Sequence, residues 1–114
     1  MTIKECYAII GDYEDALARL MKDSLLKRFL GKFTEDKSYE SLCTALEKEN
    51  YEEAFRCAHT LKGVAGNLAL TELAALSSEV TEILRDREPH DVSSQMEKLD
   101  AEYRKVVDAI RQLD

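Results

Sequence analysis

The sequence has little proline and glycine, and fewer basic than acidic side chains. It contains one proline and four glycines in 114 residues. These two residue types interrupt helices and mark loops, so their scarcity argues against a loop-rich fold. The chain carries 23 acidic and 16 basic side chains, which gives a formal net charge of −7. Because nucleic acids and anionic membranes are bound through clustered Lys and Arg, we expect neither as a partner.

Cysteine and long apolar runs are also scarce. Cys6, Cys43 and Cys57 are an odd number without Cys-x-x-Cys spacing, and no apolar signal segment precedes them. They are therefore predicted to be reduced thiols in a cytoplasmic protein, with Cys43 and Cys57 as small core side chains. No apolar run approaches the length of a membrane span. The chain length predicts one domain, residues 1–114, too small for a deep catalytic cleft between two lobes.

The apolar residues that are present recur at intervals of three and four along nearly the whole chain, which is typical of amphipathic helices. The first segment contains Gly11 and Asp12 and predicts two short helices or a broken one. Asp23, Asn50 and Thr71 are the expected capping residues of later helices. The pattern predicts an all-α fold, an antiparallel up-down-up-down four-helix bundle with an additional short helical N-terminal segment. Its expected helical ranges are 3–20, 23–34, 39–49, 51–69, 72–87 and 92–113.

Each of these helices is expected to bury one apolar stripe. The residues predicted to face the core are Leu25, Leu26, Phe29, Leu30, Phe33, Leu42, Cys43, Leu46, Tyr51, Ala54, Ala58, Leu61, Ala65, Leu68, Leu73, Leu76, Val80, Ile83, Leu84, Met96, Leu99, Tyr103, Val106, Val107 and Ile110.

His59 lies outside the apolar stripe of its helix. At about 100° per residue, its side chain projects roughly 130° from the centre of that stripe, so the imidazole is predicted to be exposed. Lys62 and Gly63 follow one turn later on the same side, and Gly66 lies there too. Each glycine costs about 1 kcal/mol relative to alanine inside a helix. We interpret both as clearing space for the backbone of another molecule to reach the imidazole.

This arrangement favours a narrow chemistry. A neutral imidazole facing solvent is a nucleophile near pH 7, and Lys62 can neutralise a charged adduct such as a phosphoryl group. Arg56 is expected to add to a local positive field on an otherwise acidic chain. No acid or serine recurs beside His59 at helical spacing, so a charge-relay hydrolase is not indicated.

The segment "HTLKGVAGNLA" resembles the signature of histidine-containing phosphotransfer (HPt) domains, HxLKGxxxxLG. The match holds at His59, Leu61, Lys62, Gly63 and Leu68, and the final glycine is replaced by alanine. This position is interpreted as a close helix contact rather than as part of the chemistry. The flanking "YEEAFRCAHTLKG" and the helical layout are similar to the family as well.

The resemblance implies a phosphoryl carrier without kinase activity of its own, in which His59 accepts and donates the group. The partners would be receiver domains of response regulators and a hybrid or sensor histidine kinase. The receiver would supply Mg²⁺, and no cofactor is expected on this chain. Partner docking would involve Arg56, Gly66 and the basic residues of the preceding helix, Lys27, Arg28 and Lys32. Their alternative role is that of an ordinary solvated helix face.

Two other functions stay open. His59 could be the phosphoacceptor of a chemotaxis-type histidine kinase, or it could be incidental in a helical interaction module. The ending "RQLD", without a linker-like tail, favours a free-standing protein, and we expect a monomer. His90 is interpreted as a polar loop residue. A metal site is not expected, because His59 and His90 lie on separate elements and Cys57 points elsewhere on its helix.

Overall fold

A computed structural model describes all 114 residues and contains only helices, without any strand. It therefore confirms the predicted all-α class. The first segment forms two short helices separated at Gly11 and Asp12, one of the two predicted possibilities. The helices are α1 (Ile3–Ile10), α2 (Tyr13–Leu20), α3 (Asp23–Phe33), α4 (Ser38–Glu47), α5 (Tyr51–Asn67), α6 (Thr71–Ile83) and α7 (Ser93–Ile110).

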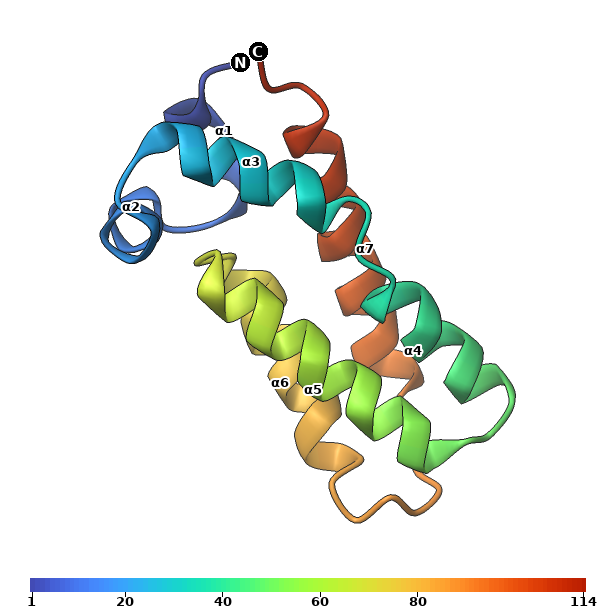
Figure 1. Ribbon diagram of the computed structural model, residues 1–114. Coiled ribbons are helices and arrows are strands. Elements are labelled where there is room, and N and C mark those ends of the chain that lie inside the picture. The colour runs from blue at the N-terminus through green and yellow to red at the C-terminus, as the bar shows by residue number, and fades with distance from the viewer.

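The helices form an elongated body of 41 × 22 × 20 Å. Helices α5 and α6 lie side by side, α4 packs against α5, and α7 packs against α6 (Figure 1). Helix α7 continues along the body to α1, so the two chain ends lie together (Figure 1). There the Met1 amino group donates to the carbonyl oxygen of Gln112 at 2.7 Å. No helix combines the length and apolar character that would let it cross a membrane.

Polar side chains begin several of these helices. Thr2 and Glu5 form a reciprocal capping box at α1, and the Asp12 carboxylate accepts the Asp15 N–H at the start of α2. Asn50 caps α5 as predicted, its side-chain oxygen accepting the Glu53 N–H at 3.1 Å. Because these side chains satisfy N–H groups that lack a helical partner, they fix where each helix begins.

Two predicted caps are wrong. Lys22 occupies the cap position of α3, and Asp23 is the first helical residue, whose carboxylate accepts the Tyr13 hydroxyl at 2.6 Å. Leu70 occupies the cap position of α6, and the Thr71 hydroxyl instead donates back to the Ala69 carbonyl oxygen. Both side chains are therefore used to join neighbouring segments rather than to start a helix.

The core forms one cluster along the inner faces of all seven helices. Most residues of the predicted stripes are buried, but Phe29 is 38 % exposed. The predicted core residues that are only half-buried are Leu25, Cys43, Leu46, Tyr51, Ile83, Met96 and Tyr103. The largest fully buried side chains are Tyr7, Ile10, Leu26, Leu30, Leu42, Leu61, Leu70, Leu73, Val80, Leu84, Leu99 and Val106.

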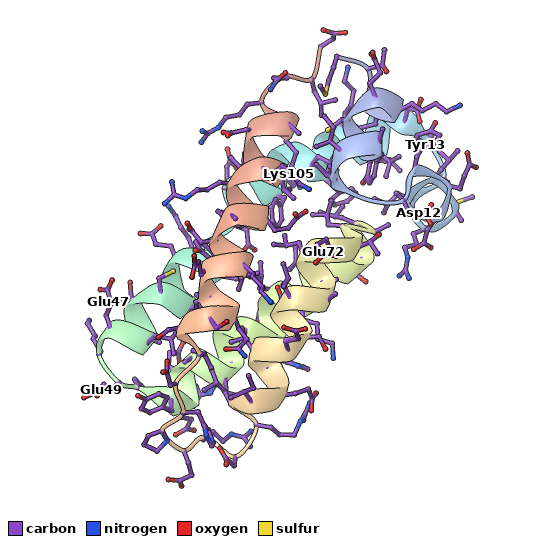
Figure 2. All side chains as sticks on the ribbon, turned by 180° about the vertical axis from the view of Figure 1, so that it is seen from behind. Asp12, Tyr13, Glu47, Glu49, Glu72 and Lys105 are labelled. Carbon is purple, nitrogen blue, oxygen red and sulfur yellow. The ribbon has the colours of Figure 1, made fainter.

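Three polar side chains are also buried. The hydroxyls of Ser77 and Thr81 each donate to the carbonyl oxygen four residues earlier in α6, which satisfies them without an outside partner. Glu102 is the exception, because one carboxylate oxygen has no hydrogen-bond partner while the other meets Lys105 at 3.0 Å. Lys105 lies in the half of α7 that is close to the N-terminal helices (Figure 2).

The N-terminal helices attach to the far end of α5. The Tyr7 hydroxyl donates to the Leu68 carbonyl oxygen at 2.8 Å, and the Asp12 N–H donates to the Ala69 carbonyl oxygen at 3.0 Å. Asp12 and Tyr13 lie at this end, and Glu47 and Glu49 lie at the other (Figure 2). The first segment therefore supports the end of the helix that carries His59.

Candidate functional site

His59 lies near the middle of α5, and its side chain is exposed as predicted. The opposite face of the helix is anchored in the core through Ala54, Ala58, Leu61 and Ala65. Because this face is fully packed, the backbone that carries the imidazole has a fixed position. Neither ring nitrogen of His59 has a hydrogen-bond partner within the protein. The imidazole is therefore free to react with, or bind, another molecule.

Phe55, one turn before His59, restricts the orientation of the imidazole. The two rings are stacked with centroids 6.0 Å apart and an interplanar angle of 15°. Phe55 is itself buried and hence held in place. Aromatic pairs at this separation attract weakly, so the contact favours one orientation of the imidazole. The sequence analysis did not identify Phe55, although its spacing of four residues from His59 would have predicted the contact.

The residues after His59 leave the surface open on its C-terminal side. A Cβ atom added at Gly63 or Gly66 would meet no other heavy atom within 4 Å. Packing within the protein therefore does not require glycine at either position. Lys62 is half-buried and forms no salt bridge, so its ammonium group is available to a ligand.

Two arginines reach the same region from the end of α6. The Arg85 and Arg87 guanidinium groups lie 5.7 and 4.3 Å from the centre of the Phe55 ring, on which His59 also stacks. Such contacts with an aromatic ring hold a cation in place. Neither arginine was predicted as a site residue, because both follow His59 by more than twenty positions in the sequence. The short connection between α5 and α6 was the available signal, since it makes the two helices neighbours.

Glu82 brings a negative charge to this region. Its carboxylate binds Arg85 through two contacts, 2.7 Å to Nη2 and 3.1 Å to Nε. The pKa of Glu82 is lowered, chiefly by the hydrogen bond from Arg85 and further by the charges of Lys62 and His59. The prediction that no acid recurs beside His59 at helical spacing concerned α5 alone, and Glu82 is on the neighbouring helix α6.

Arg56 does not add a free positive charge beside His59. Its guanidinium is 2.7 Å from Glu52 and 3.6 Å from Glu53, both on the preceding turn of α5. These acids raise the pKa of Arg56, and the hydrogen bond that Arg56 donates to Glu52 contributes most. Its charge is thus balanced within its own helix. The cation that follows His59 on α5 and has no acidic partner is Lys62, whereas Arg85 and Arg87 lie against the Phe55 ring.

The basic residues of α3 divide into two groups. Lys32 lines a groove of about 410 Å³ together with Val64, Asn67 and Leu68 near the end of α5. Its ammonium group lies 5.6 Å from the centre of the exposed Phe29 ring. Lys27 and Arg28 are exposed on α3 but do not line this groove. The structure therefore brings Lys32, but not the other two, to the α5 surface.

The remaining candidate ligands lie apart from His59. His90 is in the loop before α7, where its Nε2 is 3.0 Å from both carboxylate oxygens of Asp86. The Cys57 thiol is buried and donates to Glu53, and burial, followed by that contact, raises its pKa to about 11. No three His, Cys, Asp or Glu side chains are grouped as a metal site would require.

The family model described as "Hpt domain" matches residues 24–113, which include α3 apart from its first residue and all of α4 to α7. No curated protein and no solved structure matches the chain. Hpt domains carry phosphoryl groups on histidine in phosphorelays, where they interact with receiver domains and histidine kinases. The match covers well over half of the sequence, and the chain therefore belongs to the Hpt domain family.

Proposed function

We propose that the protein carries a phosphoryl group on His59 between aspartates of receiver domains. The observation that carries this proposal is an exposed, unbonded imidazole beside an unpaired ammonium group and two glycines with open space, within a family of phosphoryl carriers. Residues 1–114 would act as one domain, with α4 to α7 as an antiparallel bundle of alternating direction and α1 to α3 supporting one end.

The transfer step uses the free ring nitrogen of His59. Its lone pair attacks the phosphorus of the receiver's aspartyl phosphate, the new N–P bond forms, and the P–O bond to the aspartate breaks. The aspartate leaves as a carboxylate, and the phosphoryl group stays on the imidazole. The same step in reverse returns the group to another receiver. Phosphoryl transfer depends mostly on positioning and charge stabilisation, so the role of this chain is to hold the imidazole and neutralise the oxygens.

Lys62 and Gly63 have separate roles in this proposal. The Lys62 ammonium group stabilises the charge on the phosphoryl oxygens, in the transition state and in the phosphohistidine. Gly63 keeps the approach open, because any side chain there would project into the space beside His59. Gly66 and Lys32 belong to the surface that meets the receiver. The receiver's own carboxylates would hold Mg²⁺, and this chain supplies no ligand to it.

The test is direct transfer from radiolabelled, phosphorylated receiver domains of the same cell. The protein should acquire a phosphate that is labile in acid and stable in base. His59→Gln should remove all labelling without changing helicity or melting temperature, and His90→Gln should transfer as the wild type does. Labelling retained by His59→Gln would refute the assignment. Receivers that bind the protein but never label it would instead indicate an interaction module.

A further inference from the structure

We infer that Glu82 limits how strongly the site holds a phosphoryl group, by binding Arg85 and by opposing the charge of the adduct. This inference rests on the proposed function of His59. It concerns a residue of α6 that lies outside the family signature around the histidine. Glu82 would act as a positioning residue, since it works through a neighbouring cation and through its own charge.

A series of contacts connects Glu82 to His59 through Arg85 and Phe55. Glu82 engages Arg85 through two of the guanidinium nitrogens, and the same guanidinium lies 5.7 Å from the Phe55 ring. Phe55 in turn stacks on His59. Arg85 and His59 thus lie against the same Phe55 ring, and the hydrogen-bonding edge of the guanidinium is already occupied by a carboxylate. A phosphoryl group on His59 would have to compete with Glu82 for it.

The charges around Glu82 favour its ionised form. The hydrogen bond from Arg85 is the largest cause that lowers the pKa of Glu82, and the charges of Lys62 and His59 on α5 lower it further. Glu82 is therefore ionised at neutral pH. A phosphoryl group adds close to two negative charges at the position of His59. Repulsion between Glu82 and the adduct then opposes the attraction from Lys62.

Glu82 is therefore expected to make the phosphorylated form of His59 less stable relative to the unphosphorylated form. A carrier with three unopposed cations would stabilise phosphohistidine and release the group slowly. By occupying Arg85 in the resting state, Glu82 keeps the phosphorylated and free states closer in free energy. Lys62 and Arg87, which have no carboxylate partner, stay available to the phosphoryl oxygens.

The experiment uses the full chain phosphorylated chemically, so no receiver is needed. The His59 nitrogen attacks the phosphorus of phosphoramidate, the N–P bond of the reagent breaks, and ammonia leaves. The second ionisation of the attached phosphoryl group is then followed by ³¹P NMR as a function of pH. A nearby negative charge disfavours the dianion and moves this titration to higher pH.

Glu82→Gln should shift the titration midpoint to lower pH by about 0.3 to 1 unit, because it removes a charge and frees Arg85. The shift should shrink in about 1 M salt, which a purely structural change would not do. Glu82→Asp, which keeps the charge, should resemble the wild type. Glu79→Gln is the matched control, an exposed and unpaired acid one turn earlier on α6.

The same variants should also differ in transfer. At equilibrium with a receiver, Glu82→Gln should retain about threefold to tenfold more phosphohistidine than the wild type. A titration midpoint in Glu82→Gln equal to those of the wild type and Glu79→Gln would overturn the inference. If the titration shifts but no receiver accepts the group, the charge relationship stands and the proposed function fails.

Discussion

The backbone of Gly11 lies so close to Ala69 that a Cβ atom at position 11 would stand 1.9 Å from the Ala69 carbonyl oxygen. The contact joins the α1–α2 connection to the turn that ends α5. The next N–H along the chain, that of Asp12, donates to the same carbonyl oxygen at 3.0 Å. Glycine is therefore required at position 11 by the close approach of two backbone segments.

Gly11→Ala should accordingly destabilise the protein. The methyl group forces apart two backbone segments that share a hydrogen bond, and we expect a loss of about 2 to 3 kcal/mol in the free energy of unfolding. Gly31→Ala is the matched control, since a Cβ there meets nothing within 4 Å and the site lies inside α3. It should gain about 0.5 to 1 kcal/mol. Urea denaturation measures both, and equal effects would contradict the steric explanation.

Ala69 also has a left-handed backbone conformation, with φ 53°, directly after α5. The Ala69 N–H donates to the Gly66 carbonyl and the Leu70 N–H to the Ala65 carbonyl, which is the Schellman pattern of a helix end. Glu49 has the same role after α4, with φ 55°. This explains the final glycine of the family signature as a backbone requirement, in addition to the close contact predicted from the sequence.

Glycine substitutions should therefore stabilise both helix ends, but by different amounts. Glu49 is exposed, so Glu49→Gly should gain about 1 kcal/mol from relief of the left-handed conformation. Ala69 is 4 % exposed, and Ala69→Gly loses a buried methyl group worth about 0.8 kcal/mol, which offsets most of the gain. Denaturation midpoints decide the order. A larger gain at position 69 would show that burial of the methyl group contributes little.

These left-handed residues explain why the helix ends were predicted less well than the helices. The apolar period predicts every helix from α3 onwards, but it extends α4, α5 and α6 to Glu49, Ala69 and Arg87, all of which have positive φ. Glycine at such positions would have marked the ends. With other residues there, only the tertiary contacts of the turn show where each helix stops.

The site was predictable only where it is local in sequence. His59, Lys62 and Gly63 follow one another at helical spacing, so their shared face could be predicted without a structure. Glu82, Arg85 and Arg87 reach that face from the end of α6 and the loop after it, and their approach depends on how the two helices pack. The ion pairs of Arg56, in contrast, were predictable from the sequence, because Glu52 and Glu53 precede it by four and three positions on the same helix.

Gly63→Gln should separate stability from activity. Glutamine is the better helix former by several tenths of a kcal/mol, about 0.6, and meets no steric obstacle within the protein. Its side chain would nevertheless occupy the approach to His59, so transfer from a receiver should slow at least about tenfold. Gly31→Gln should show the stability gain alone. A wild-type transfer rate for Gly63→Gln would contradict the interpretation that Gly63 keeps the approach to His59 open.

Lys62→Ala should slow transfer about tenfold to a hundredfold, or about 1.4 to 2.7 kcal/mol in the barrier, without abolishing it. In the proposed transfer the receiver would also bring positive charge, and Arg87 lies against the nearby Phe55 ring, so the lysine would be one contributor among several. Lys62→Arg should recover part of the rate. Single-turnover transfer at two salt concentrations provides the measurement. The control is Lys98→Ala, which removes an exposed lysine of α7. If Lys62→Ala transfers at the same rate as this control, the Lys62 ammonium group has no role in transfer.

Asp100 should account for part of the acid sensitivity of the fold. Its carboxylate accepts the Tyr39 hydroxyl and, at 2.8 Å, Nε of Arg104, and these two contacts, the first above all, lower its pKa from 3.8. A carboxylate whose pKa is lower in the folded state stabilises that state above its unfolded pKa, and this stability is lost as pH falls through the folded value.

Asp100→Asn should therefore melt at a lower temperature than the wild type at pH 7, where the charge is present. As the pH falls through the unfolded and then the folded pKa of Asp100, the wild type should lose stability faster, and the melting temperatures of the two proteins should converge. Asp108→Asn, on the same helix with a carboxylate that bonds to nothing, should keep the pH dependence of the wild type. Because Tyr39 is on α4 and Asp100 on α7, a melting difference that does not change with pH would mean that the contact contributes packing between these helices rather than charge.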